Sequence, residues 1–116
     1  RADWLLYNEE ERDKYLNDPH IPAQITASLM YELLSGMINC VSKKAKTASL
    51  APVYILSGSD DAVSEYGKNI KTTVNLMTKQ GFNIKDIVIF NNMRHDILHE
   101  KDNIKVLDYI YEAITH

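Results

Sequence analysis

The sequence predicts an α/β fold in which parallel strands are joined by crossover helices. Two short, mainly apolar runs, VYIL at residues 53–56 and DIVIF at residues 86–90, have the composition of strands buried in a sheet. Segments with the apolar spacing of helices precede, separate and follow them, so that the order from Thr26 is α-β-α-β-α. Strands that alternate with helices in this way form parallel sheets with right-handed crossovers.

The first part of the chain predicts two helices. A short helix over residues 9–16 ends at Asn17-Asp18-Pro19, and Pro19 and Pro22 favour an extended chain after it. A second helix begins near Thr26, with Thr26 or Ser28 as its N-cap. Its apolar residues recur at i, i+3, i+4, i+7, i+8 and i+11: Met30, Leu33, Leu34, Met37, Ile38 and Val41. The loop SKKAKTASLAP then leads to the first strand.

Two further helices follow the strands. The helix expected at about residues 63–80 has an inner face marked by Tyr66, Ile70, Val74 and Met77, and Gly81 ends it as a C′ residue. The last helix, at about residues 101–114, carries one apolar stripe: Ile104, Leu107, Ile110, Tyr111 and Ile114.

Composition and charge exclude several classes of protein. The formal net charge is −3, so there is no basic excess for contacts with a phosphate backbone, and nucleic acid is not an expected partner. No apolar run approaches the roughly 20 residues of a membrane-spanning helix, and no signal peptide is visible. The single cysteine, Cys40, lies in an apolar helical pattern, which indicates a buried thiol in a reducing compartment and therefore a cytoplasmic protein.

Two features indicate that this chain is a piece of a longer protein. It begins with RADWLLYNEEE, without a Met and within a polar, amphipathic stretch. It also offers only two strands, whereas a stable sheet normally needs three or more. We therefore expect part of the domain to lie outside this sequence.

The candidate catalytic residues follow the two strands. Active sites of open α/β sheets lie beyond the carboxyl ends of the strands, where this chain has polar turns at residues 58–61 and 91–95. An Asp beside a His fixes its tautomer and stabilises its imidazolium, as in a Ser-His-Asp triad. We expect a carboxylate oxygen of Asp61 to lie about 2.6–3.2 Å from Nδ1 of His95. The chain order of Asp61 before His95 fits the order Ser, Asp, His of α/β hydrolases.

The stretches ILSGSDDAVSEYG and GFNIKDIVIFNNMRHDILHE resemble the end of an α/β hydrolase of the monoacylglycerol lipase, lysophospholipase and serine aminopeptidase S33-like group. The resemblance implies that Asp61 is the catalytic acid and His95 the catalytic base. It also implies that residues 1–25 end the cap region and its connection, with Trp4 near the acyl site. Residues 26–116 would then form the C-terminal part of the catalytic domain, without its nucleophile half.

The chain departs from the family pattern at three points. Ala62 replaces the proline after the acid, and Asp96 replaces the glutamate after the histidine, but neither change removes a catalytic group. The third departure is larger, because no G-x-S-x-G nucleophile motif occurs in the sequence. The expected partner is therefore the missing N-terminal half of the domain, or a second copy of the fragment.

The resemblance implies a serine hydrolase that cleaves carboxylic esters of monoacylglycerol- or lysophospholipid-like substrates. Its partner would be a small-molecule ester or lipid, and no cofactor and no metal are implied. The fragment alone is expected to be inactive.

Three alternatives remain open from the sequence. Asp60 competes with Asp61 for the role of the acid, although a solvated turn acid suits it better. His95 and His99, at i and i+4, would share a helix face, so that H-D-I-L-H approaches the H-E-x-x-H motif of zinc proteases. Otherwise His99 and Glu100 are expected on the surface of a helix start. The chain could also be a non-catalytic binding or assembly module.

Overall fold

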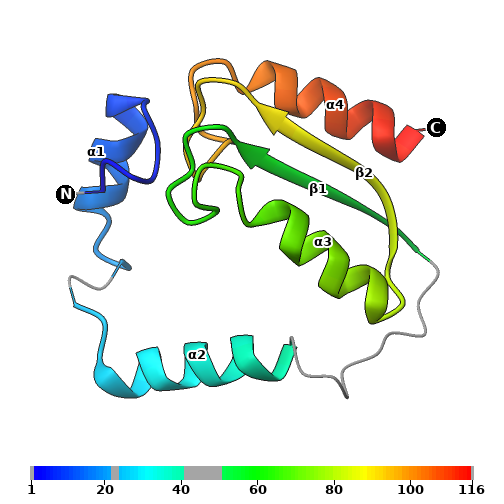
Figure 1. The fold of residues 1–116 in the computed structure, drawn as a ribbon. Coiled ribbons are helices and arrows are strands. Elements are labelled where there is room, and N and C mark those ends of the chain that lie inside the picture. The colour runs from blue at the N-terminus through cyan, green and yellow to red at the C-terminus, as the bar shows by residue number, and fades with distance from the viewer. Residues whose placement is uncertain (1, 22–23, 41–50, 116) are drawn as a thin grey trace.

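A computed structural model describes residues 2–21, 24–40 and 51–115 of the chain. It contains four helices and two strands in these ranges: α1 (Glu9–Asn17), α2 (Ala27–Cys40), β1 (Pro52–Gly58), α3 (Ile70–Lys79), β2 (Asn83–Phe90) and α4 (Ile104–Thr115). The predicted order α-β-α-β-α from Thr26 is confirmed (Figure 1). Val41 and residues 42–50 of the predicted loop lie outside the described residues.

The two strands pair in parallel, as predicted. The register runs from Pro52 opposite Asn83 to Gly58 opposite Phe90, with one irregularity between Val53 and Tyr54. The carboxyl ends of the strands therefore lie at the same edge of the sheet. The turns that follow both strands begin side by side.

Helix α4 packs on one face of the strand pair, and α3 lies on the other side of it (Figure 1). The ring of Tyr109 in α4 packs against Tyr54 of β1 and Phe90 of β2, with centroids 6.4 and 6.3 Å apart. Its hydroxyl group donates a hydrogen bond of 2.6 Å to Asp86 of β2. This bond raises the pKa of Tyr109 to about 12, because the phenolate would lose the bond and face the carboxylate.

The strands are less buried than their apolar composition predicts. Residues 53–56 are half-buried, and Ile87 and Ile89 of β2 are 42% and 45% exposed. The expectation of strands buried on both faces is therefore wrong for this chain. With two strands in the described part of the chain, the sheet is too narrow for its helices to enclose it.

Helix α3 begins at Ile70, later than the predicted residue 63. Residues 62–69 instead form turns, in which Glu65 and Tyr66 adopt positive φ angles of 51° and 57°. Tyr66 consequently lies outside the helix and is exposed, whereas Ile70 is buried as predicted.

The predicted end of α3 is confirmed. Gly81 has a φ of +93°, the left-handed conformation that glycine adopts without a Cβ penalty. The amide of Phe82 donates to the carbonyl of Met77 at 3.0 Å, and that of Gly81 to the carbonyl of Thr78 at 3.1 Å. Both bonds of a Schellman motif are therefore present.

Helix α2 has no buried residue. Its predicted N-cap is present, because the Oγ1 of Thr26 accepts the amide of Leu29 at 3.1 Å. Cys40 is exposed, which corrects the expectation of a buried thiol. The end of α2 is contacted by Gln80, whose Nε2 donates to the carbonyl of Cys40 at 2.6 Å, but the thiol itself is not covered. We define the α2 stripe as the described residues of the predicted apolar spacing, all of which are exposed: Met30, Leu33, Leu34, Met37 and Ile38.

We call the predicted apolar residues of α4 the α4 stripe: Ile104, Leu107, Ile110, Tyr111 and Ile114. All of them are exposed except Ile110, which is half-buried. The helix instead turns Val106 and Tyr109 towards the rest of the chain. The Cα radius of gyration is 16.1 Å, whereas a compact domain of this length has about 13 Å. In the described part of the chain, no helix has both the length and the apolar character needed to cross a membrane.

Candidate active site

Two turns meet beyond the carboxyl ends of β1 and β2. We call residues 58–61 the acid turn and residues 91–95 the histidine turn. The amide of Ser59 donates to the carbonyl of Phe90 at 2.9 Å, and the amide of Asp60 donates to that of Met93 at 2.9 Å. The amide of Asn92 returns a bond of 3.0 Å to the hydroxyl oxygen of Ser59. The parallel ladder is thereby extended into the turns, which fixes their relative position.

Gly58 permits this close approach. A Cβ atom built on Gly58 would lie 2.2 Å from the carbonyl oxygen of Met93 and 2.3 Å from that of Arg94. These contacts are with backbone atoms, which cannot rotate away as the end of a side chain could. Glycine is therefore required at the end of β1 for the histidine turn to reach the acid turn.

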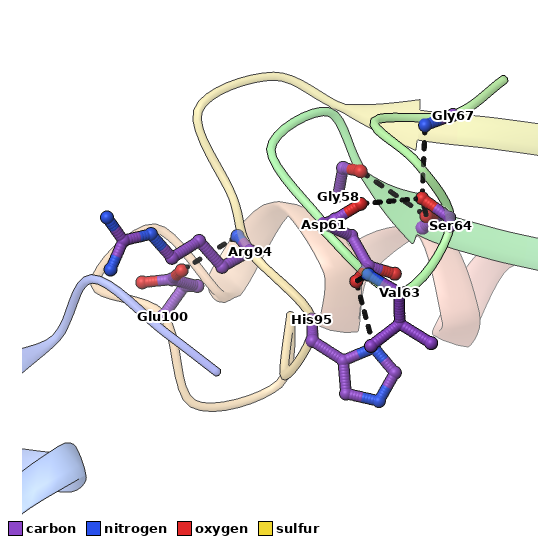
Figure 2. A network of polar contacts seen from close by, with 9 residues as sticks. Gly58, Asp61, Val63, Ser64, Gly67, Arg94, His95 and Glu100 are labelled. Carbon is purple, nitrogen blue, oxygen red and sulfur yellow. Dashed lines mark hydrogen bonds and ion pairs between the residues drawn. The ribbon is translucent and has the colours of Figure 1, made fainter. Parts of the chain in front are cut away.

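Asp61 and His95 are brought together by these turns (Figure 2). Nδ1 of His95 lies 3.1 Å from Oδ1 of Asp61, within the range expected from the sequence. Asp61 is only 6% exposed, whereas the side chain of His95 is 43% exposed. A buried carboxylate beside an accessible imidazole favours the tautomer with hydrogen on Nδ1. Nε2 of His95 then remains as a hydrogen-bond acceptor.

The carboxylate of Asp61 is also held by its own turn. Oδ1 accepts the amide of Val63 at 2.8 Å, in addition to its contact with His95. The carbonyl of Asp61 accepts the hydroxyl of Ser64 at 3.0 Å, and the same hydroxyl oxygen accepts the amide of Gly67 at 3.0 Å (Figure 2). These local bonds orient the acid independently of the histidine.

Asp60 contacts different partners. Its Oδ1 accepts the hydroxyl of Ser59 at 2.8 Å, and its Oδ2 accepts the hydroxyl of Tyr7 at 2.8 Å. These two bonds, first that from Ser59, lower the pKa of Asp60 below its usual value. Of the two neighbouring acids, Asp61 is therefore the one that contacts His95.

The geometry does not support the zinc alternative. None of residues 95–99 is helical, so His95 and His99 do not share a helix face. His99 pairs with Asp96, whose oxygens both lie 2.9 Å from Nδ1, and this hydrogen bond raises the pKa of His99. Among residues 2–21, 24–40 and 51–115, no group of three or more His, Cys, Asp or Glu side chains could hold a metal ion.

Glu100 is buried, with 4% of its surface exposed, which corrects the expectation of a surface residue. Its carboxylate accepts amides from Tyr7, Asn8 and Arg94. Two of these donors are more than 90 positions away. No local pattern in the sequence indicates such a contact, so Glu100 could not be found without the fold.

The N-terminal segment covers one side of the site. The rings of Trp4 and His95 have centroids 5.5 Å apart. The guanidinium of Arg94 lies 3.8 Å from the centroid of the Tyr7 ring, which is a cation–π contact. A cavity of about 340 Å³ opens here. It is lined by Asp3, Trp4, Tyr7, Asp60, Ala62, Tyr66 and Arg94.

The model of the serine aminopeptidase S33 family matches residues 1–102 of the 116 residues. The chain belongs to this α/β-hydrolase family. A highly thermostable carboxyl esterase from Bacillus coagulans, solved in complex with glycerol, is a similar structure, with a TM-score of 0.71 and 20% sequence identity. The alignment covers 97% of this chain and 36% of the esterase, so the chain spans about a third of that protein. A search of curated proteins finds no match.

The fold expectation is therefore confirmed: the described residues form part of an α/β-hydrolase fold with parallel strands and helices. The family match also agrees with the resemblance of the two stretches that include the end of β1 and the whole of β2.

Proposed function

We propose that Asp61 and His95 are the acid and the base of a Ser-Asp-His triad in a serine hydrolase that cleaves carboxylic esters. The observation that carries the proposal is the 3.1 Å contact between Nδ1 of His95 and Oδ1 of Asp61, at the carboxyl ends of adjacent parallel strands. Membership of the serine aminopeptidase S33 family supports it.

In this mechanism the nucleophile is a serine supplied from outside this sequence, which has no G-x-S-x-G motif. The serine oxygen attacks the ester carbonyl, and Nε2 of His95 takes its proton and then gives it to the leaving alcohol. His95 next takes a proton from water, whose oxygen attacks the acyl-enzyme, and returns that proton to the serine. Asp61 holds the tautomer and offsets the imidazolium charge in both steps.

We further propose monoacylglycerol- or lysophospholipid-like esters as the substrate class. The cavity beside the pair carries aromatic side chains from Trp4 and Tyr66 together with charged groups of Asp60 and Arg94. Such a mixed wall suits a substrate with an apolar chain and a polar head group. No metal or cofactor is needed for the proposed steps.

The test uses a longer gene product that contains a G-x-S-x-G motif together with residues 1–116. Asp61→Asn should lower kcat by about 10⁴-fold, because the wrong histidine tautomer would be held, and His95→Ala should lower it by a similar or larger factor. Asp96→Asn and His99→Ala provide a matched control, because they remove the other Asp–His pair, and they should change kcat less than threefold. Equal losses in both pairs would contradict the assignment.

The 116-residue chain by itself should hydrolyse p-nitrophenyl esters no faster than its His95→Ala variant, because the nucleophile is absent. The comparison is made at equal protein concentration and pH. Turnover that exceeds the variant, and that a serine-directed phosphonate abolishes, would show that one of the chain's own serines is the nucleophile.

A second candidate function is a non-catalytic binding or assembly module, and the exposed α2 stripe favours it. The two functions differ in their partner. A hydrolase requires the missing N-terminal half of its domain, whereas an assembly module pairs with a second copy of the chain. A gene without an upstream G-x-S-x-G motif, together with defined oligomers of the purified chain, would favour the module.

In either case we propose a cytoplasmic location, because an exposed lone thiol such as Cys40 persists in a reducing compartment.

A further inference from the structure

Glu100 lies where the N-terminal segment meets the histidine turn. Its Oε1 accepts the amide of Arg94 at 2.9 Å and that of Tyr7 at 2.9 Å. Its Oε2 accepts the same Tyr7 amide at 2.9 Å and the amide of Asn8 at 3.2 Å. One buried carboxylate therefore joins residues 7 and 8 to the residue that precedes His95.

A carboxylate is the side chain that this arrangement requires. All three groups that converge on Glu100 are backbone N–H donors, and an ionised carboxylate offers two acceptor oxygens and no hydrogen to oppose them. A glutamine of the same shape would turn an NH₂ group towards at least one of the amides. A glutamine at position 100 would therefore keep the shape of Glu100 but would not keep all of its hydrogen bonds to the three amides.

The consequences of these bonds converge on His95. On one side, the bond to the amide of Arg94 fixes the backbone of the histidine turn immediately before His95 (Figure 2). On the other side, the bonds to the amides of Tyr7 and Asn8 hold the segment that carries Trp4, whose ring lies beside that of His95. The imidazole is thereby placed between the carboxylate of Asp61 and the indole of Trp4.

Two further hydrogen bonds connect the N-terminal segment to the chain around the histidine turn. The amide of Asp96 donates to the carbonyl of Leu5 at 2.8 Å, and Nδ2 of Asn8 donates to the carbonyl of His99 at 3.0 Å. These contacts remain when Glu100 is substituted. A substitution of Glu100 can therefore loosen the contact between the N-terminal segment and the histidine turn without unfolding the strand pair.

We propose that Glu100 is a positioning residue, which fixes the histidine turn and the Trp4 segment to each other so that His95 is held between Asp61 and Trp4. The proposal rests on the proposed function, because it assigns Glu100 to the support of the proposed base.

The test uses the fluorescence of Trp4, which is the single tryptophan of the sequence. A protonated imidazole in contact with an indole quenches its emission, so the emission of the wild-type chain should show a step with pH. His95→Ala should remove this step and thereby assign it. Glu100→Gln should reduce its amplitude at least twofold, because Trp4 moves away from His95, while far-UV circular dichroism stays unchanged.

Glu112→Gln is the matched control, because Glu112 is an exposed glutamate of α4, and it should leave the step intact. A full step in Glu100→Gln would overturn the proposal. The proposal would also be overturned if the wild-type emission showed no step with pH, or a step that remained in His95→Ala. The measurement involves no turnover, so it tests the role of Glu100 separately from the proposed hydrolase activity. The chain could lack that activity and still show the step and its loss in Glu100→Gln.

A second measurement applies to the unmodified chain and covers the case in which Glu100→Gln does not fold. In NMR spectra recorded across pH, the carboxyl carbon of Glu100 and the amide protons of Tyr7 and Arg94 should shift with a common midpoint. Amide protons that do not follow the Glu100 carboxyl carbon would overturn the proposal.

Discussion

Gly58 controls the approach of the acid turn to the histidine turn. Gly58→Ala would place a methyl group 2.2 Å from the carbonyl oxygen of Met93, so the turns must separate. We expect a loss of about 1–3 kcal/mol in the free energy of unfolding, the usual cost of forcing an extra methyl into a packed site. Urea unfolding measures this loss, and the nuclear Overhauser contacts of His95 should weaken in the same variant.

Gly36→Ala is the control, because no atom lies within 4 Å of the position where its Cβ would be built. It should stabilise α2 by about 0.5–1 kcal/mol, since glycine is a poor helix former. If Gly58→Ala proved as stable as Gly36→Ala, the close backbone contact at the end of β1 would not require glycine.

His99 and Asp96 should give a pH-dependent contribution to stability. Because Asp96 raises the pKa of His99 in the folded chain, the contribution is fully present below the unfolded value of about 6.5. It is lost as the pH rises through the folded pKa. The stability difference between wild type and Asp96→Asn should therefore be larger at pH 5.5 than at pH 9, by about 0.2–1 kcal/mol for an exposed pair.

Asp102→Asn provides the comparison, since Asp102 pairs with Lys105 and not with a histidine. Its effect on the free energy of unfolding should be the same at both pH values. A larger effect of Asp96→Asn at the higher pH would contradict the sign derived from the pKa of His99.

Single residues differ in how far their sequence context reveals them. The contact between Asp61 and His95 was predictable because each residue follows a strand, and the parallel order of the strands determines that the two turns meet. Glu100 was not, because its donors at residues 7 and 8 are distant in the sequence. The exposure of Cys40 was not predicted for a different reason. An apolar pattern shows which face of a helix would be covered, but not whether a partner that covers it is present.

At the scale of elements, the start of α3 shows where apolar spacing misleads. The spacing of Tyr66, Ile70 and Val74 continues through residues that are not helical. There, the side chains of Asp61 and Ser64 accept or donate bonds to the local backbone and so compete with the helix. The strands, in contrast, lie where their apolar runs predicted, because both runs are short and end in polar turns.

The Schellman motif at the end of α3 permits a quantitative prediction. Gly81→Ala should lower the free energy of unfolding by about 1–2 kcal/mol, because an L-residue with a Cβ is disfavoured at a φ of +93°. The loss should be visible in urea unfolding. Gly36→Ala, at a helical position, makes the same chemical change and should show a gain, so two losses would argue against a specific role of the turn.

For the molecule as a whole, the exposed apolar surface should cause association. The α2 stripe and most of the α4 stripe lie in solvent in the described chain, and exposed apolar side chains that gather on one helix face favour association. We expect light scattering at micromolar concentration to report a mass above the 13.3 kDa of one chain. A stable, compact monomer would contradict the expectation.

Leu33→Lys should lower the apparent mass, because it places a charge within the α2 stripe. Asn39→Lys introduces the same charge at an exposed position outside the α2 stripe and should have little effect. If both variants or neither reduced the mass, the α2 stripe would not be the contact surface.

The anchoring of Asp61 in its own turn has a consequence for the order of events during folding. The contact of Oδ1 with the amide of Val63 spans two residues, whereas its contact with His95 spans 34 and requires a helix and a strand between them. Loop closure over a longer segment costs more entropy, and distant contacts form more slowly. The bond that orients the carboxylate of Asp61 therefore forms before its contact with His95. The imidazole then docks against a carboxylate that is already oriented.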